Sequence, residues 1–346
     1  APQEDVAHLG AVAVDRRYQD VARPVLAELH DQLREVGLPG VDAGVGEAEW
    51  RERVLDMLAR LHVRATFFVL GSAVKAHPEL IAREVAEGHG EIERLLTQGA
   101  AMAPDALTML ERIGPMQGWR CLDIGCGPRG ITDLMSARVG ASGRVVGLDR
   151  DPVFLEFARK HAAANTEFRH GDAYASDLPA GSFDLVHMRF VASTAGEPER
   201  LLKEAARLAR PGGIVALQEP DAGTLVCYPP HPAWDRLKAA LIGAFNGVGA
   251  DLELARRLYH VMYRAGFQDV QYRAALLGVR PADPMVDYLP STVESLRGTI
   301  LRLGLLSEGE LDAALADCRR HLATPGTSFT MYTVAQVWGR TSQRGN

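Results

Sequence analysis

Apolar residues in the first ninety positions follow helical and strand spacing in turn. Residues 19–36 and 47–61 place apolar side chains three and four positions apart, which predicts two amphipathic helices. Residues 65–71 form a short apolar run of β-forming residues closed by glycine, the pattern of a buried strand. A helix is expected to begin at Pro78 and to end near Glu87. The start of the chain therefore predicts a small α/β segment.

From Arg120 onward, apolar runs alternate regularly with glycine-rich turns and helical segments. This alternation is typical of a parallel α/β sheet, in which helices connect neighbouring strands. The predicted strands cover residues 120–124, 144–148, 167–170, 183–187 and 214–218. The predicted connecting helices cover residues 130–139, 152–164 and 197–209. Beyond Pro220 the pattern changes, with helical spacing over 232–265 and 284–322 and further strands at 266–272 and 328–338.

Composition and charge narrow the class of protein. A chain of 346 residues with 47% apolar and 24% charged residues suits two or three globular domains. Its formal net charge of −6 provides no overall basic field, so we do not expect nucleic acid as a partner, although a local basic patch stays an alternative. The four cysteines form no CxxC pair, which predicts neither a disulfide framework nor a structural metal. Because no long apolar run or signal-peptide pattern occurs, we expect a cytoplasmic protein without a membrane segment.

A glycine-rich turn follows the strand predicted at 120–124. Gly125 and Gly127 lie where a strand gives way to a helix, a place at which glycines let the backbone approach a ligand closely. Asp123 precedes the first glycine, and Asp149 closes the next strand, where a carboxylate can accept both ribose hydroxyls of a nucleoside. NAD and S-adenosylmethionine (SAM) share that requirement. Asp123 favours SAM, because a carboxylate suits a sulfonium and an ammonium better than a pyrophosphate.

These residues resemble the class I SAM-dependent methyltransferase family, whose first motif is similar to Leu122-Asp123-Ile124-Gly125-Cys126-Gly127. The resemblance covers about residues 91–221 and continues through Gly171-Asp172-Ala173, the strand at 183–187 and the turn at 208–213. It implies SAM as the cofactor. Arg129 departs from the family, which often has a small residue there, and either crowds the ligand or points to solvent. The cofactor-binding residues that the resemblance implies are Asp123, Gly125, Cys126, Gly127, Asp149, Arg150, Asp172, Ala173 and His187.

A second resemblance lies upstream. Residues 54–89 look like part of a polysaccharide deacetylase domain, a family that holds a metal with an Asp and two histidines spaced His-x-x-x-His. This chain contains no such histidine pair and no Asp-Asp pair in its first fifty residues, so we expect no metal site. We interpret residues 1–90 as an N-terminal α/β appendage with a structural or interaction role, which caps the substrate cleft, mediates a homodimer or is an evolutionary remnant. Residues 91–346 then form a Rossmann-like methyltransferase domain with an inserted helical cap at about 222–265 and 284–322.

The acceptor of the methyl group should lie beyond the carboxyl ends of the strands, near the cofactor. His187 is a candidate general base or a packed strand-end histidine, and Arg189 either orients an acceptor carboxylate or pairs with Asp184 or Asp172. Glu219 either faces the acceptor or caps a turn. The catalytic candidates are thus His187 and Arg189, and the candidates for substrate binding are Arg189, Glu219, Tyr228, His231 and Tyr259. The last three either line an acceptor pocket or pack in the core.

These features favour a methyltransferase that modifies a small molecule, as in the tailoring of a specialised metabolite. That step rests on analogy with other members of the fold. Two alternatives stay open. The first is a methyltransferase that acts on protein or RNA with residues 1–90 as a docking module, and the second is a SAM-binding protein that does not methylate.

Overall fold

The structure, a computed structural model, describes the backbone of residues 78–343 and the side chains of residues 92–343. The chain divides into two compact units, residues 1–87 and 88–346. The elements predicted at 19–36, 47–61 and 65–71 lie outside the described residues, as does most of the proposed appendage. Helix α4 (Pro78–Ile113) does not end near Glu87, as the sequence predicts, but runs on for another 26 residues.

Helix α4 continues past Gly88 and Gly90 and also contains Gly99 and Pro104. Each glycine inside a helix costs roughly 1 kcal/mol relative to alanine. Further along, Ala106, Met109 and Leu110 are completely buried against the sheet. Burial of a large apolar side chain contributes about 1.5–3 kcal/mol, so this face holds the later turns of α4 on the sheet.

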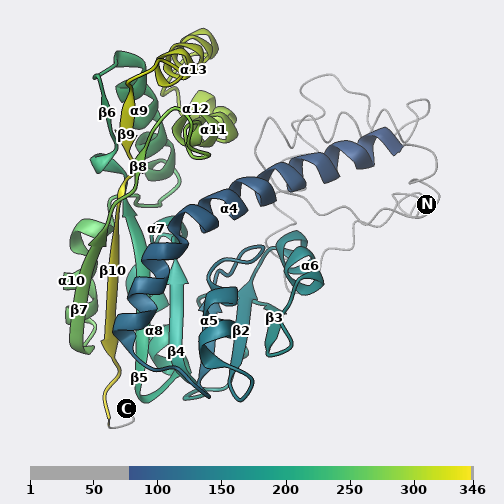
Figure 1. Cartoon of the computed structure of the whole chain (residues 1–346), viewed down its shortest axis with the longest axis vertical. Helices are drawn as coiled ribbons and strands as arrows, with labels where there is room; N and C mark the ends of the chain where they lie inside the picture. Colours follow the sequence, from purple (N-terminus) through teal and green to yellow (C-terminus); the bar gives the residue numbers. More distant parts are fainter. Residues whose placement is uncertain (1–77, 344–346) are drawn as a thin grey trace, which may run out of the picture. The chain divides into compact units, whose positions relative to one another are not determined.

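The second unit is built on a seven-stranded sheet with the strand order β3-β2-β1-β4-β5-β10-β7 (Figure 1). The first five strands in this order are parallel, whereas β10 runs antiparallel to both of its neighbours. The strands are β1 (Arg120–Ile124), β2 (Arg144–Asp149), β3 (Thr166–His170), β4 (Phe183–Arg189), β5 (Ala209–Asp221), β7 (Gln268–Ala275) and β10 (Thr333–Arg340).

Helices cover both faces of this sheet. Successive side chains of a strand point to opposite faces, so Cys121, Leu185 and Ala216 pack beneath α4 and α5 (Thr132–Val139). The opposite face buries residues such as Leu122 and Val186 against α8 (Pro198–Leu208) and α10 (Ala255–Arg264). Helix α6 (Pro152–Lys160) packs on β2 and β3. Burial on both faces is why the central strands β1 and β4 are largely apolar in sequence.

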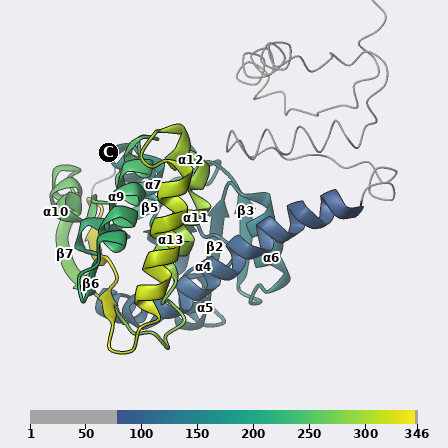
Figure 2. The same cartoon turned by 90° about the horizontal axis from the view of Figure 1, so that it is seen from above.

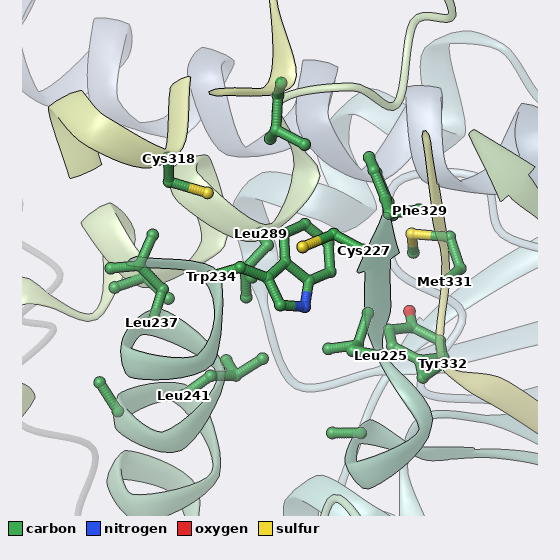
Figure 3. Close-up of a cluster of buried hydrophobic side chains, with 14 of the residues drawn as sticks. Leu225, Cys227, Trp234, Leu237, Leu241, Leu289, Cys318, Phe329, Met331 and Tyr332 are labelled. Atoms are coloured by element: carbon green, nitrogen blue, oxygen red, sulfur yellow. The ribbon is translucent and has the colours of Figure 1, made fainter. Parts of the chain in front are cut away.

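A separate helical cap follows the carboxyl end of β5, as Figures 1 and 2 show. Its apolar core surrounds Trp234, which is almost fully buried (Figure 3). A small sheet in the order β6-β9-β8 completes the cap. The cap is reached through the 3-10 helix η2 (Ala222–Thr224). Its elements are β6 (Val226–Tyr228), α9 (Pro232–Asn246), β8 (Gly278–Val279), α11 (Tyr288–Ser295), α12 (Arg297–Arg302), α13 (Glu308–Leu322) and β9 (Ser328–Thr330).

The α/β fold predicted from the sequence is confirmed, and two segments differ in detail. The final strand predicted at 328–338 is two strands, because β9 joins the cap sheet and β10 joins the main sheet. The helical region expected at 222–265 also divides. Helix α9 packs in the cap core, while α10 packs on β5, β7 and β10 of the main sheet.

Candidate functional site

The glycine turn after β1 combines close packing with open space. Gly125 and Gly127 have positive φ angles of 67° and 58°, a region that glycine adopts without steric cost. A Cβ on Gly125 would lie 2.4 Å from Val191 Cγ2, so protein already fills that side of the turn. A Cβ on Gly127 would meet no described atom within 4 Å. Space for a ligand is therefore available beside Gly127.

Asp149, at the end of β2, is fixed by backbone amides. The Gly127 amide donates to its Oδ2 over 2.8 Å, and the Asp151 amide donates to its Oδ1 over 2.9 Å. Burial raises the pKa of Asp149, and these amide hydrogen bonds oppose the rise. Each carboxylate oxygen offers about two acceptor positions, so both oxygens can still accept a ligand hydroxyl.

Asp123 and His187 form a buried pair between β1 and β4. Asp123 Oδ1 lies 2.7 Å from His187 Nδ1, and His187 Nε2 lies 2.9 Å from Gln218 Nε2. His187 has 0% exposed surface and both of its ring nitrogens are engaged. A general base must reach the proton that it removes. The structure therefore does not support His187 as a general base and places it as a packed histidine that holds Asp123.

The other residues implied for cofactor binding have mixed positions. Asp172 is exposed, and its Oδ1 accepts from the Tyr174 amide over 2.9 Å, while Ala173 is half-buried and Arg150 is exposed. The side chain of Cys126 instead packs among Leu155, Ala158 and Phe168. Burial raises the pKa of the Cys126 thiol well above its usual range. Only the backbone of Cys126 is left to face a ligand.

Arg129 does not crowd the glycine turn. Its Nε donates to Asp133 Oδ2 over 2.7 Å, one turn further along the chain. Both side chains are substantially exposed. Of the two alternatives drawn from the sequence, the structure supports the one in which Arg129 points away from the ligand space.

Arg189 ends β4 on the sheet face covered by α4. Its Nη2 would lie 3.6 Å from a Cβ on Gly99 of that helix. Neither predicted ion pair forms, because Asp184 pairs with Arg210 over 2.6 Å and Asp172 forms a local turn. Within residues 92–343 no carboxylate lies in ion-pair distance of Arg189. Burial lowers the pKa of the Arg189 guanidinium, and the charges of Asp123 and Tyr332 oppose this shift.

A polar and aromatic wall lies near Arg189. Phe190, with a φ of 59°, packs edge-to-face on Tyr332 at 5.6 Å between ring centroids. The hydroxyl of Tyr332 accepts from Gln98 Nε2 over 2.8 Å and lies 3.1 Å from the hydroxyl of Tyr288. Burial holds the pKa of Tyr332 well above its usual range. Helix α4, strand β4 and the cap thus meet at this end of the sheet.

Glu219 is not an acceptor-binding residue in this structure. It has 0% exposed surface, and its two carboxylate oxygens accept from the amides of Ala192 and Ser193 over 2.9 and 3.1 Å. These amides open helix α7 (Ala192–Ala195), whose first N–H groups have no partner within the helix. Burial raises the pKa of Glu219 to about 7. The alternative in which Glu219 caps a turn is the one that the structure supports.

The remaining candidates for acceptor binding do not come together. Tyr228 is 69% exposed on β6, and Tyr259 is 45% exposed on α10, where it packs against Tyr272 of the edge strand β7. His231 caps α9 by accepting from the Ala233 amide over 3.2 Å. These side chains belong to the cap and to the edge of the sheet at β7, and no contact among the described residues joins them to Arg189.

Comparison with known proteins identifies a family for the segment that contains the glycine turn. Residues 122–217 match the family described as methyltransferase domain. Demethylmenaquinone methyltransferase of Lactococcus lactis subsp. lactis is 36% identical over 123 residues, which cover 34% of this chain and 49% of that protein. An uncharacterized 37.1 kDa protein in transposon TN4556 of Streptomyces fradiae is 33% identical over 141 residues, 40% of this chain and 41% of its own length. The chain contains a class I SAM-dependent methyltransferase domain.

Further comparisons add context to this methyltransferase domain. The chain spans less than half the length of the two curated relatives. Among solved structures, the YcgJ protein from Bacillus subtilis is similar with a TM-score of 0.46 at 21% identity, over 70% of this chain and 99% of that one. Residues 40–93 match the family described as polysaccharide deacetylase. That match agrees with the resemblance found at 54–89, of which residues 54–77 lie outside the described residues.

The residues of the methyltransferase domain fit SAM, the cofactor of such domains. The open side of Gly127 provides space, Asp149 keeps acceptor positions for the ribose, and Asp123 contributes a buried carboxylate beside the turn. Among the described residues, no group of three or more His, Cys, Asp and Glu side chains suits a metal ion. No helix between residues 78 and 343 is long and apolar enough to cross a membrane.

A set of hydrogen-bonded polar side chains on the sheet face covered by α4 was not predicted from the sequence. Gln218, Gln336 and Arg273 continue from His187 across β5, β10 and β7, and Arg273 Nη2 reaches Asp105 Oδ1 of α4 over 2.6 Å. The only signal was two glutamines within strands that otherwise read as apolar. Their meeting depends on the pairing of Gln336 with Gln218, which the sequence alone does not contain.

Proposed function

We propose that this protein transfers a methyl group from SAM to a small-molecule acceptor that presents an oxygen anion or an acidic hydroxyl to Arg189. Bound SAM supplies a sulfonium-activated methyl group. The observation that carries the proposal is the fixed Asp149 carboxylate beside the open glycine turn. Asp149 would hold the ribose, and Asp123 would hold the ammonium of the methionine part.

Arg189 supports the choice of acceptor. Arg189 is half-buried and has no carboxylate in ion-pair distance within residues 92–343, so its guanidinium is available to a ligand. A nearby cation stabilises the ionised form of a hydroxyl and lowers its pKa. This effect matters because His187 and Glu219 are both engaged inside the protein. Arg189 would prepare the nucleophile electrostatically and orient it through its planar fork.

The fold supports exclusion of water from this reaction. Methyl transfer is an in-line displacement, so the protein must align nucleophile, methyl and sulfur. Phe190 and Tyr332 pack against each other near Arg189, and the cap core adjoins them. The relatives named demethylmenaquinone methyltransferases make demethylmenaquinone the first acceptor to test.

The test uses the full chain, methyl-labelled SAM and a panel of demethylmenaquinone, phenols, enols and small carboxylates. Mass spectrometry should find one added methyl per product and an equal amount of S-adenosylhomocysteine. Labelling of protein or RNA from a cell extract, with every small molecule inert, would replace this proposal by the one in which residues 1–90 dock a macromolecule. A chain that binds SAM and labels nothing would instead indicate a SAM-binding protein without this activity.

A further inference from the structure

A continuous row of hydrogen bonds crosses the methyltransferase sheet from Asp123 to its edge. The polar row consists of one side chain from each of the strands β1, β4, β5, β10 and β7, namely Asp123, His187, Gln218, Gln336 and Arg273. Beyond the Asp123–His187 and His187–Gln218 contacts, Gln336 Nε2 lies 2.9 Å from Gln218 Oε1, and Arg273 Nη1 lies 2.7 Å from Gln336 Oε1. Gln336 Nε2 also lies 3.0 Å from the carbonyl oxygen of Asp105 on α4.

The chemistry at the sheet edge fixes the direction of these bonds. Arg273 has donors only, so the atom of Gln336 that faces it must be the carbonyl oxygen. The backbone oxygen of Asp105 accepts only, so the atom of Gln336 that faces it must be the amide nitrogen. Two independent partners therefore require the same orientation of the Gln336 amide.

The orientation of the Gln336 amide determines that of Gln218, which in turn determines the proton position on His187. The amide nitrogen of Gln336 donates to Gln218, which must present its oxygen and so turns its own nitrogen toward His187. His187 Nε2 then has to accept a hydrogen bond and carries no proton. The remaining proton of the neutral ring is on Nδ1 and is donated to Asp123 Oδ1.

We infer that Gln336, anchored by Arg273 and Asp105, is a positioning residue that keeps His187 neutral, with its proton on Nδ1, and thereby preserves the negative charge of Asp123 for a cationic ligand group. The link to SAM rests on the proposed function. Asp123 Oδ2 lies on the side of the glycine turn, 3.3 Å from a Cβ placed on Gly130. A protonated His187 would neutralise Asp123 beside the already cationic Arg189. This change would weaken the attraction of the site for an ammonium group.

The test reads the protonation of His187 directly by ¹⁵N NMR on the full-length protein labelled in histidine. Loss of one set of ring signals in His187→Gln assigns them. In the unaltered protein, Nδ1 should carry the proton and Nε2 should have the shift of an unprotonated nitrogen. A proton on Nε2 overturns the inference, whether or not the chain binds SAM or methylates anything. The outcome is thus separate from that of the proposed function.

The variant Gln336→Glu tests whether Gln336 determines the protonation of His187 through Gln218. A carboxylate accepts from Arg273 but cannot donate, so Gln218 should turn its nitrogen toward position 336 and its oxygen toward His187. His187 should then carry protons on both nitrogens, and the affinity for SAM should fall about tenfold, as expected for a weakened charge-assisted contact. The comparison variant is Gln336→Met, which has a similar length and neither donates nor accepts strongly, so it releases the Gln218 amide without reversing it. A proton should therefore appear on His187 Nε2 in Gln336→Met, but less completely than in Gln336→Glu. A His187 ring that keeps its single proton on Nδ1 in both folded variants would contradict the proposed role of Gln336.

Discussion

The amide of Gly127 donates to Asp149 Oδ2 over 2.8 Å and thereby joins the glycine turn after β1 to the end of β2. The Asp151 amide holds the other carboxylate oxygen, so the side chain is oriented before any ligand arrives. Such preorganisation reduces the cost of ordering groups on binding. Asp149 is therefore the residue whose removal should affect SAM affinity most specifically.

We predict that Asp149→Ala weakens SAM binding by about 1–3 kcal/mol, the range for a lost hydrogen bond to a charged group. Isothermal titration calorimetry measures this change. Asp133→Ala is the control, because that carboxylate pairs with Arg129 on the exposed side of the same region. Equal SAM affinities for Asp149→Ala and the unaltered chain would remove Asp149 from the cofactor site.

The two glycines of the turn should respond differently to alanine. At Gly127 an added methyl group enters open space, so the unliganded protein should lose only about 1–2 kcal/mol for the positive φ, while SAM binding suffers more. At Gly125 the methyl group meets Val191, so the unliganded protein itself should be destabilised further.

Thermal unfolding with and without SAM separates these two effects. Gly127→Ala should mainly reduce the stabilisation that SAM provides, and Gly125→Ala should mainly lower the melting temperature of the unliganded protein. If SAM stabilises Gly127→Ala as strongly as the unaltered chain, the open side of Gly127 does not face the cofactor.

The central strands were predictable because they are buried on both faces. Strands β1 and β2 read as apolar runs that end at a glycine turn or an aspartate, and β1 has the predicted bounds of Arg120 and Ile124. The break at Met331 and Tyr332 was not predictable, because alternation over 328–338 continues through the point where the chain passes from the cap sheet to the main sheet. The alternation of apolar and polar residues along a strand does not indicate which sheet the strand joins.

The residues that bind the methyl acceptor were harder to predict than those that bind the cofactor. Asp149 and Gly127 belong to one local motif, in which spacing along the chain largely determines position in space. Tyr228 and His231 follow a proline-rich stretch and Tyr259 lies in a helical pattern, and neither feature reveals the side of the cap or sheet that a side chain faces. The row through Gln336 depends on strand register, which follows from the assembled sheet.

Arg189 should act on the acceptor. We predict that Arg189→Met lowers kcat/KM for an anionic or acidic acceptor by roughly a hundredfold, since a hydrogen bond to a charged group contributes about 1.5–3 kcal/mol. Arg189→Lys should retain part of the activity, because it keeps the charge but loses the planar fork. Steady-state kinetics at saturating SAM provides the measurement. A loss in Arg189→Met that is equally large for a neutral acceptor would show that Arg189 does not recognise the anionic group.

Glu219 should make stability depend on pH. Its pKa is raised by burial from 4.5 to about 7, so the folded protein binds a proton more tightly than the unfolded chain. Stability from this group is then greatest below the unfolded value of 4.5 and falls as pH rises toward 7. The loss is of the order of 3 kcal/mol, because one pKa unit corresponds to about 1.4 kcal/mol.

Urea unfolding at a series of pH values between about 5 and 8 tests this dependence. The variant Glu219→Gln keeps the shape of the side chain but cannot ionise, so its stability should vary less over this interval than that of the unaltered protein. The amides of Ala192 and Ser193 both donate to Glu219, and a glutamine has one oxygen to serve them. Glu219→Gln should therefore be the less stable protein near pH 5, with the difference shrinking as pH rises. Parallel pH profiles for the two proteins would mean that the ionisation of Glu219 is not coupled to folding.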